Sequence, residues 1–213
     1  MNIKHYTLAA LFLLIAAPNT FGQIQKGEQN LSLTAIYSSK AQDIFVNDNA
    51  ANLQPATMEM GLSVGYTYFL FNRFSIGGNI MVPYTRTPIG KTTNGSYMYN
   101  TTYGFQIGPE LRDYVPITDQ LYWVISASAA FGCGKYHEDL NGGSPIETNY
   151  KGAMVIVAPL GLEFRASDRI SIGLTVGAFV HSTTQVTVDD VTVKSNQTMW
   201  QLNRSDISLN IWF

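Results

Sequence analysis

The sequence is poor in charge and in cysteine, and each shortage excludes a class of protein. Only 13% of the 213 residues are charged, about half the share found in an ordinary soluble protein. The single cysteine, Cys133, excludes an intramolecular disulfide framework and any zinc site built from several cysteines. Lysine and arginine number 13 against 15 aspartates and glutamates, so a net charge of −2 offers no basic surface for nucleic acid.

Long apolar runs are also scarce, and the one clear run lies at the N-terminus. Lys4 precedes the apolar residues Leu8–Ala17, Pro18 interrupts them, and small residues precede a cleavage point after residue 22. The run is about half as long as a membrane-spanning helix requires, so it predicts a secretory signal peptide over residues 1–22. We expect residues 23–213 to form one domain. If this domain crosses a membrane, we expect it to do so with strands closed into a barrel.

The chain is rich in aromatic residues, glycine and a two-residue periodicity. It contains 12 Tyr, 11 Phe, 3 Trp and 18 Gly. In Met58–Tyr68, apolar side chains alternate with Glu59 and with small residues such as Gly61 and Ser63. A strand places such sets on opposite faces. The pattern predicts eight strands, near residues 31–38, 58–68, 74–84, 103–112, 121–132, 154–164, 170–181 and 204–213.

The two faces of these strands favour a narrow barrel over a soluble sandwich. The less apolar face consists mostly of Gly, Ser, Thr and Asn, whereas a sheet that faces water usually carries more Lys and Glu. Small polar residues suit the crowded interior of a narrow barrel, and the apolar face would then meet lipid. In the later strands we assign to this lipid face Met154, Ile156, Ala158, Ala178 and Val180.

The connections between the strands alternate in length, as they do in transmembrane barrels with short periplasmic turns and longer external loops. The short ones are 70–73, 115–120 and 166–169, and the long ones are 40–56, 85–96, 133–149 and 182–195. Asp189-Asp190 is expected at the tip of a hairpin between 185–188 and 191–194. We therefore predict an all-β, eight-stranded, antiparallel up-and-down transmembrane β-barrel.

Aromatic residues and two prolines refine this prediction. We expect aromatic belts at both membrane interfaces. The belt on the short-turn side would contain Tyr68, Phe69, Phe71, Phe74, Tyr114, Tyr122, Trp123, Phe164, Trp212 and Phe213, and the belt on the loop side Tyr84, Tyr97, Tyr99, Phe131, Tyr150 and Trp200. Pro109 and Pro159 fall within strands of a sheet without edges, so we expect a bulge or a shifted register at each.

Three segments resemble the outer membrane protein beta-barrel domain family, the small OmpX-, OmpA- and OmpW-like barrels of Gram-negative bacteria. Ile107–Tyr114 is similar to the family's GPxxRYY stretch, with Asp113 in place of a tyrosine. Residues 23–27 followed by 31–39 look like its opening strand. Alternate apolar residues at the C-terminus resemble the signal read by the barrel assembly machinery: Ile207, Leu209, Ile211 and Phe213. The resemblance implies an outer-membrane location and leaves the activity open.

Charged residues on the interior face form the one candidate site. Eight strands leave an interior just wide enough for side chains, and unpaired buried charges cost several kcal/mol. We therefore expect an ion-pair network that fills the lumen, and the alternative is a gate or small polar conduit. Its members would be Glu59, Glu110, Arg112, Glu163, Arg165, Arg204 and Asp206.

No catalytic or cofactor-binding constellation is expected. His181 and Ser182 are adjacent, so a strand would point them to opposite faces, which does not suit a lipid hydrolase. His137 lies beside two carboxylates, too few ligands for a metal site. We expect no metal, no cofactor and no enzymatic activity.

The sequence thus favours an integral protein of the cell outer membrane whose external loops mediate surface interaction or adhesion. The expected partners are outer-membrane lipids, the assembly machinery and an unidentified surface partner, with no nucleic acid, and we expect a monomer. A narrow porin-like channel for small or apolar solutes is one alternative. A secreted soluble barrel that binds a ligand in an apolar interior is the other.

Overall fold

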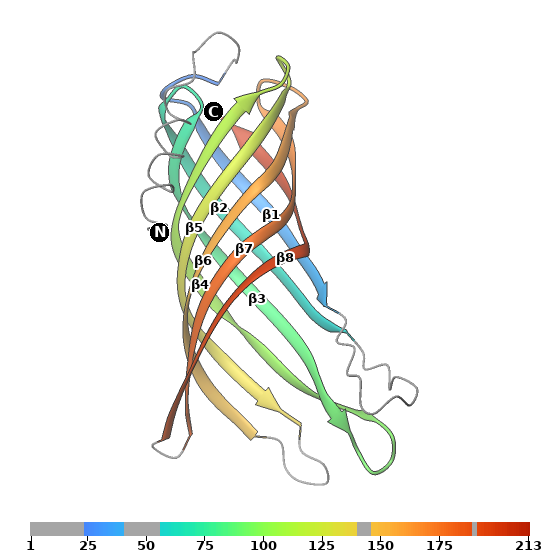
Figure 1. The fold of residues 1–213 in the computed structure, drawn as a ribbon. Helices are drawn as coiled ribbons and strands as arrows, with labels where there is room; N and C mark the ends of the chain where they lie inside the picture. The colour runs from blue at the N-terminus through green and yellow to red at the C-terminus, as the bar shows by residue number, and fades with distance from the viewer. Residues whose placement is uncertain (1–23, 41–55, 140–145, 189–190) are drawn as a thin grey trace, which may run out of the picture.

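The computed structural model, which describes residues 24–40, 56–139, 146–188 and 191–213, forms one closed antiparallel ring of eight strands (Figure 1). Each strand pairs with its sequence neighbours, and the first pairs with the last. The predicted fold class is confirmed. The predicted signal peptide lies outside the described residues and stays a prediction. The strands are β1 (Gln29–Lys40), β2 (Thr57–Phe71), β3 (Phe74–Lys91), β4 (Tyr97–Pro116), β5 (Leu121–Glu138), β6 (Ile146–Arg165), β7 (Ile170–Val188) and β8 (Val191–Trp212).

The short turns gather at one end of the ring, at the top of Figure 1, where the C-terminus also lies. They comprise residues 72–73, 117–120 and 166–169, close to the predicted connections. Arg73 adopts a φ of 80° in the tightest of them, an unusual conformation for a residue with a side chain. We call this the periplasmic end, because outer-membrane barrels keep their short turns there.

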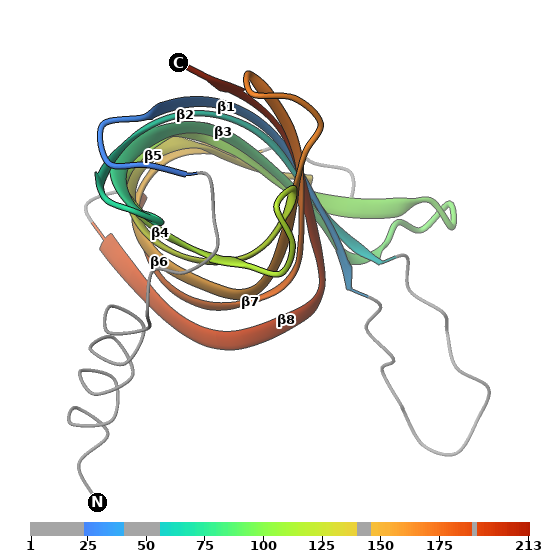
Figure 2. The ribbon, with the colours of Figure 1, turned by 90° about the horizontal axis from the view of Figure 1, so that it is seen from above.

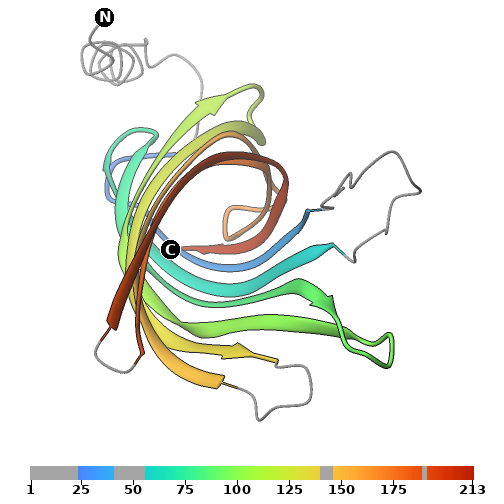
Figure 3. The same ribbon diagram turned by 60° about the horizontal axis from the view of Figure 1, so that its bottom comes forward.

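The opposite, external end consists of extended hairpins where the sequence suggested long loops (Figure 3). β3 and β4 continue to Lys91 and from Tyr97, and β5 and β6 continue to Glu138 and from Ile146. The pairing of β7 with β8 continues to Val188 and Val191, as the predicted hairpin requires, while Asp189-Asp190 lie outside the described residues. The predicted connection 40–56 agrees with the end of β1 at Lys40 and the start of β2 at Thr57. The other three predicted loops were too long because these segments carry Thr, Tyr and Val, which favour strands even above a membrane.

The outer wall of the ring is apolar. Large hydrophobic side chains are exposed along every strand, for example Leu62 (61% exposed), Val82 (56%) and Ile207 (58%). About ten residues of a tilted strand cross a bilayer, so the strands of 18–22 residues extend well beyond it. An apolar outer wall is consistent with the contact with lipid that the alternating pattern predicted.

None of the described residues belongs to a helix long and apolar enough to cross a bilayer.

The lipid face was assigned wrongly for the external halves of β6 and β7. Ala178 and Val180 are 1% and 4% exposed and point into the ring with Ala158, Met154 and Ile156, whereas Val155, Val157 and Phe179 face outward. Two irregularities cause this exchange. The β5–β6 register shifts between Val124 and Ser126, opposite the Pro159 region, and the β7–β8 register shifts at Gly177, whose φ is +74°. An extra residue at a bulge reverses every later side chain.

The expectations for the two prolines had different outcomes. The register shift opposite Pro159 confirms the one expected there. At Pro109 the expected shift is wrong, since Ile107↔Phe131 and Glu110↔Ser128 keep one register on either side of an unpaired step. The pairing of Pro109 with Gly78 also stays in register on its other side. The missing N–H of Pro109 therefore interrupts the β4–β5 hydrogen-bond ladder locally, without an extra residue in either strand.

Candidate functional site in the barrel lumen

The predicted interior charges form two ion pairs within single strands. On β4, the Arg112 Nε lies 2.9 Å from Glu110 Oε1, and Arg112 also donates to the Ser32 hydroxyl at 3.5 Å. On β8, Arg204 contacts both carboxylate oxygens of Asp206 at 3.1 and 3.2 Å through Nε. Residues two apart on a strand share a face, so the alternating pattern brings each pair together.

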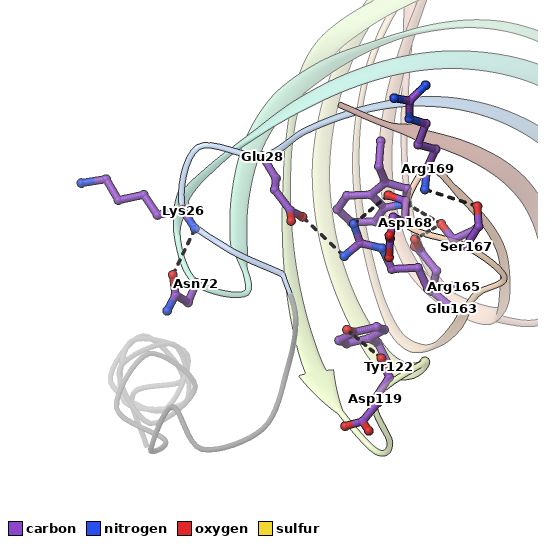
Figure 4. Close-up of polar contacts among 12 residues, drawn as sticks. Lys26, Glu28, Asn72, Asp119, Tyr122, Glu163, Arg165, Ser167, Asp168 and Arg169 are labelled. Carbon is purple, nitrogen blue, oxygen red and sulfur yellow. Dashed lines mark hydrogen bonds and ion pairs between the residues drawn. The ribbon is translucent and has the colours of Figure 1, made fainter.

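The other three predicted members contact residues outside the predicted set. Arg165 lies 3.5 Å from the Glu28 carboxylate across the periplasmic mouth (Figure 4). Its guanidinium also stacks 4.5 Å from the Trp212 ring centroid. Glu163 accepts a hydrogen bond from Ser171. Glu59 accepts one from Gln201 Nε2 at 3.3 Å. Five of the seven predicted residues line one central cavity, namely Glu110, Arg112, Glu163, Arg204 and Asp206. A role as a single lumen-filling network stays a prediction.

Aromatic side chains fill the periplasmic end of the lumen. The rings of Phe69, Tyr114, Tyr122 and Trp212 are almost completely buried and pack with centroids 5.3–6.3 Å apart. Ile24, from the segment before β1, is buried in the same cluster. We call these five residues the plug. Rings in such tilted and edge-on contacts contribute dispersion and electrostatic attraction beyond their burial.

The N-terminal segment is held at this mouth by its backbone. Gly27 N donates to Phe69 O at 2.9 Å, and Lys26 N donates to the Asn72 side-chain oxygen at 3.0 Å (Figure 4). Gly27 has a φ of +94°, which glycine adopts without strain. This turn places the preceding Ile24 in the buried cluster inside the ring, whose backbone Figure 2 shows from above.

A buried polar chain connects the plug to the interior charges. Trp212 Nε1 donates to the Ser171 hydroxyl at 2.7 Å, and that hydroxyl donates to Glu163. The inward indole therefore has a hydrogen-bond partner, as a buried tryptophan requires. β8 pairs with β1 from Asn30↔Trp212 to Ser38↔Arg204, so the same tryptophan lies beside the seam that closes the ring.

The predicted aromatic belts are only partly correct. Tyr68, Phe71, Trp123, Phe164 and Phe213 are exposed on the outer wall at the short-turn end. The four plug aromatics and Tyr150 instead point inward. Strand parity carried the signal that was missed, since Tyr114 and Trp212 share the face of the charged residues on their own strands.

The external half of the lumen is an open cavity of about 720 Å³, which we call the cup. Its wall combines apolar side chains from the reversed halves of β6 and β7 with threonines, serines and the tyrosines 136 and 150. Glu59, Gln201 and Arg204 also line it, and Arg204 is shared with a smaller cavity deeper in the lumen. This smaller, polar cavity of about 90 Å³ is lined by the Glu110–Arg112 and the Arg204–Asp206 pairs, so the free space narrows steeply toward the plug.

Two kinds of chemistry were considered near the external end, a catalytic pair of His181 and Ser182 and a metal site at His137. His181 is exposed on the outer wall and Ser182 lines the cup, so they lie on opposite faces as expected. His181 Nδ1 instead lies 2.6 Å from the Thr198 hydroxyl across the strand pair, a contact that sequence spacing did not predict. Within the described ranges, no three Asp, Glu, His or Cys side chains gather as a metal site would require.

Comparisons with known proteins found only distant structural likenesses. No protein-family model and no curated protein matches the sequence. Among solved structures, Ail, the attachment invasion locus protein of Yersinia pestis, is 15% identical over 89% of this chain and all of that chain, with a TM-score of 0.42. The outer membrane protein OprG of Pseudomonas aeruginosa is 10% identical over 89% of this chain and 97% of that chain, with a TM-score of 0.45.

Neisserial surface protein A shows the same kind of likeness, at 13% identity over 88% of this chain and 98% of that chain, with a TM-score of 0.37. At these identities the comparisons concern the fold alone. The chain's own closed ring, apolar outer wall and alternation of turns and hairpins carry the assignment instead. By these features the chain is a closed, eight-stranded antiparallel β-barrel with the apolar outer wall of a transmembrane barrel.

Proposed function

We propose that this protein is a non-enzymatic surface barrel whose external hairpins bind a partner outside the cell. The observation that carries the proposal is strand length. β3 to β8 have 18–22 residues, about twice what a tilted strand needs to cross the bilayer. The excess lies at the external end and forms paired hairpins with polar surfaces.

The lumen supports the same proposal by what it contains. The plug fills the periplasmic mouth with packed rings, and the central cavity holds only about 90 Å³ beside its two ion pairs. A continuous water path is what a porin-like channel requires. The apolar outer wall also argues against the soluble ligand-binding alternative, because a water-soluble barrel hides such residues inside.

Shortening one hairpin tests the proposal. Residues 184–195 of the β7–β8 hairpin would be replaced by Asn-Gly, which joins Thr183 to Asn196, paired neighbours in the native register. Cells that express this variant should lose attachment to coated surfaces or to each other, while the barrel still shifts on a detergent gel when heated. A matched variant, Asp119→Asn in a periplasmic turn, should keep attachment.

Two results would contradict the proposal. If attachment is unchanged after each of the three paired hairpins is shortened in turn, the hairpins do not have this role. Stepwise ion currents through the wild-type protein in planar bilayers would favour the channel alternative instead.

A further inference from the structure

Two lysines and a glutamine form a row across the outer wall of the external hairpins. Lys151 of β6 pairs with Gln185 of β7, which pairs with Lys194 of β8. Adjacent residues of each strand line the cup, so the alternation points all three side chains outward. Neighbouring strands lie about 4.8 Å apart, so the two lysines are about 10 Å apart at the backbone, with Gln185 between them. We call these three residues the basic row.

The positive charge of the basic row is not balanced by the protein. Both lysines are exposed, and neither forms an ion pair with a described residue. In the external halves of β6, β7 and β8, the one outward carboxylate that the structure describes is Glu147. Lys135 already lies 2.8 Å from this carboxylate. The basic row therefore attracts an anion from outside the protein.

The height of the basic row above the membrane indicates the kind of anion. Six residues nearer the membrane on the same strands, Val157 pairs with Phe179 and Phe179 with Trp200, and these side chains are 37–47% exposed. We call them the apolar row, and its tryptophan marks the membrane interface. Six residues of a strand tilted by about 40° rise by about 15 Å. The headgroup layer of a phospholipid is only about 5–8 Å deep, so the basic row lies above it.

An open groove of about 650 Å³ adjoins the basic row on the outer wall. Lys151 and Gln185 line it together with the polar side chains of Asn149 and Thr187. Amide and hydroxyl groups both donate and accept hydrogen bonds, as the hydroxyls of a sugar require. A ligand with sugar hydroxyls and phosphates therefore matches the surface better than a bare phosphate does.

We propose that the basic row binds the phosphorylated sugar headgroup of a glycolipid in the membrane leaflet at the external end. Lys151 and Lys194 donate charge-assisted hydrogen bonds to its phosphate oxygens, and Gln185 contacts the sugar between them. The acyl chains of the same lipid lie against the apolar row. One lipid would thus contact both the membrane-spanning part and the external part of β6, β7 and β8.

Three probes test this selectivity on the folded full-length barrel in zwitterionic micelles. Rough lipopolysaccharide, which has a phosphorylated sugar core, phosphatidylglycerol and soluble glucose phosphate would each be titrated against ¹⁵N-labelled protein. Lipopolysaccharide should shift the amide signals of Lys151, Gln185 and Lys194 in a saturable way, and leave that of Met58 on the outer wall of β2 unchanged. The other two probes should bind more weakly by about tenfold or more.

Variants locate the site. Lys151→Gln and Lys194→Gln should each weaken lipopolysaccharide binding by about fivefold, and together by about 30-fold, because each removes one charge near an anionic lipid. Lys26→Gln is the matched control, since this exposed lysine lies at the periplasmic end, and it should leave the affinity within about twofold. All variants would be checked for the heat-induced gel shift of a folded barrel.

Four results would overturn the proposal. Equal affinity for phosphatidylglycerol would place the bound anion in the phospholipid headgroup layer, and equal affinity for glucose phosphate would show that no lipid is needed. An unchanged affinity in the folded double variant, or no saturable shift of the basic row with lipopolysaccharide, would show that this row is not the site. These titrations use purified protein, so their outcome is independent of whether the hairpins bind a surface partner.

Discussion

The two ends of this barrel fill the same ring in opposite ways. At the periplasmic end, four buried rings and Ile24 pack against one another and seal the lumen. At the external end, tyrosines and methionines line an open cup of about 720 Å³. Both ends use aromatic side chains on the inward parity, so residue type does not distinguish them. The difference lies in whether each ring has another ring opposite it, and therefore in whether its removal opens a cavity or only enlarges one.

The largest expected effect is the loss of a plug ring. Phe69→Ala should reduce the free energy of unfolding by about 3–5 kcal/mol, since it leaves a cavity between Tyr114 and Trp212. Tyr136→Ala in the cup should cost less than about 1.5 kcal/mol, because water already reaches its ring. Urea unfolding in micelles, followed by tryptophan fluorescence, measures both. Equal losses would show that the cup is packed as tightly as the plug.

The buried polar chain comes next. Ser171→Ala removes the hydroxyl between Trp212 Nε1 and Glu163, so two buried groups lose a partner. We expect a loss of about 1–3 kcal/mol in the same unfolding experiment. The matched variant Ser182→Ala lies in the open cup, where water replaces the hydroxyl, and should stay within about 0.5 kcal/mol of wild type. The prediction is wrong if the two serines cost the same.

The bulge that forms the cup wall gives a smaller effect. Gly177 has a φ of +74°, so Gly177→Ala should cost about 1–2 kcal/mol although a Cβ there would meet Gln201 O at an ordinary 3.6 Å. Gly61→Ala, in the cup wall on β2 without a left-handed φ, is the control and should be neutral or slightly stabilising. A Gly177→Ala variant as stable as wild type would mean that the bulge tolerates a side chain.

These local features mark the limit of what alternation can predict. The eight strands, their order and the short turns follow from period-two patterns and turn residues, because each strand repeats the same signal. The interior pairs Glu110–Arg112 and Arg204–Asp206 follow as well, since residues two apart share a face. Parity fails after a bulge, so the inward turn of Ala178 and Val180 was missed although Gly177 and Pro159 stood in the sequence.

Contacts between distant strands could not be predicted in the same way. Arg165 contacts Glu28, 137 residues away, and Glu59 accepts a hydrogen bond from Gln201, 142 residues away. Such pairs depend on the tilt of the strands and on how they cross the lumen, which no local pattern records. The plug was only partly predictable from the sequence. Strand parity placed its rings inside the barrel, whereas the expectation of an interfacial belt placed them outside.

The smallest expected effect lies on the outer wall above the membrane. Lys135 Nζ lies 2.8 Å from Glu147 Oε1, and this hydrogen bond, with a second from Tyr103, lowers the pKa of Glu147 below its usual range. Lys135→Met should return that pKa toward the ordinary value, measured by ¹³C NMR titration of the carboxyl. A lowered pKa stabilises the fold above the unfolded-state pKa and loses this contribution as the pH falls through the folded value.

Because both side chains of this outer pair are about half exposed, unfolding experiments should not detect the loss of Lys135, and salt should weaken the shift. The contrast is with the interior Glu110–Arg112 pair, where Arg112→Met leaves a carboxylate buried and 0.5 M salt cannot replace its partner. A Glu147 pKa unchanged by Lys135→Met would assign the shift to Tyr103 instead, and Tyr103→Phe would then raise it.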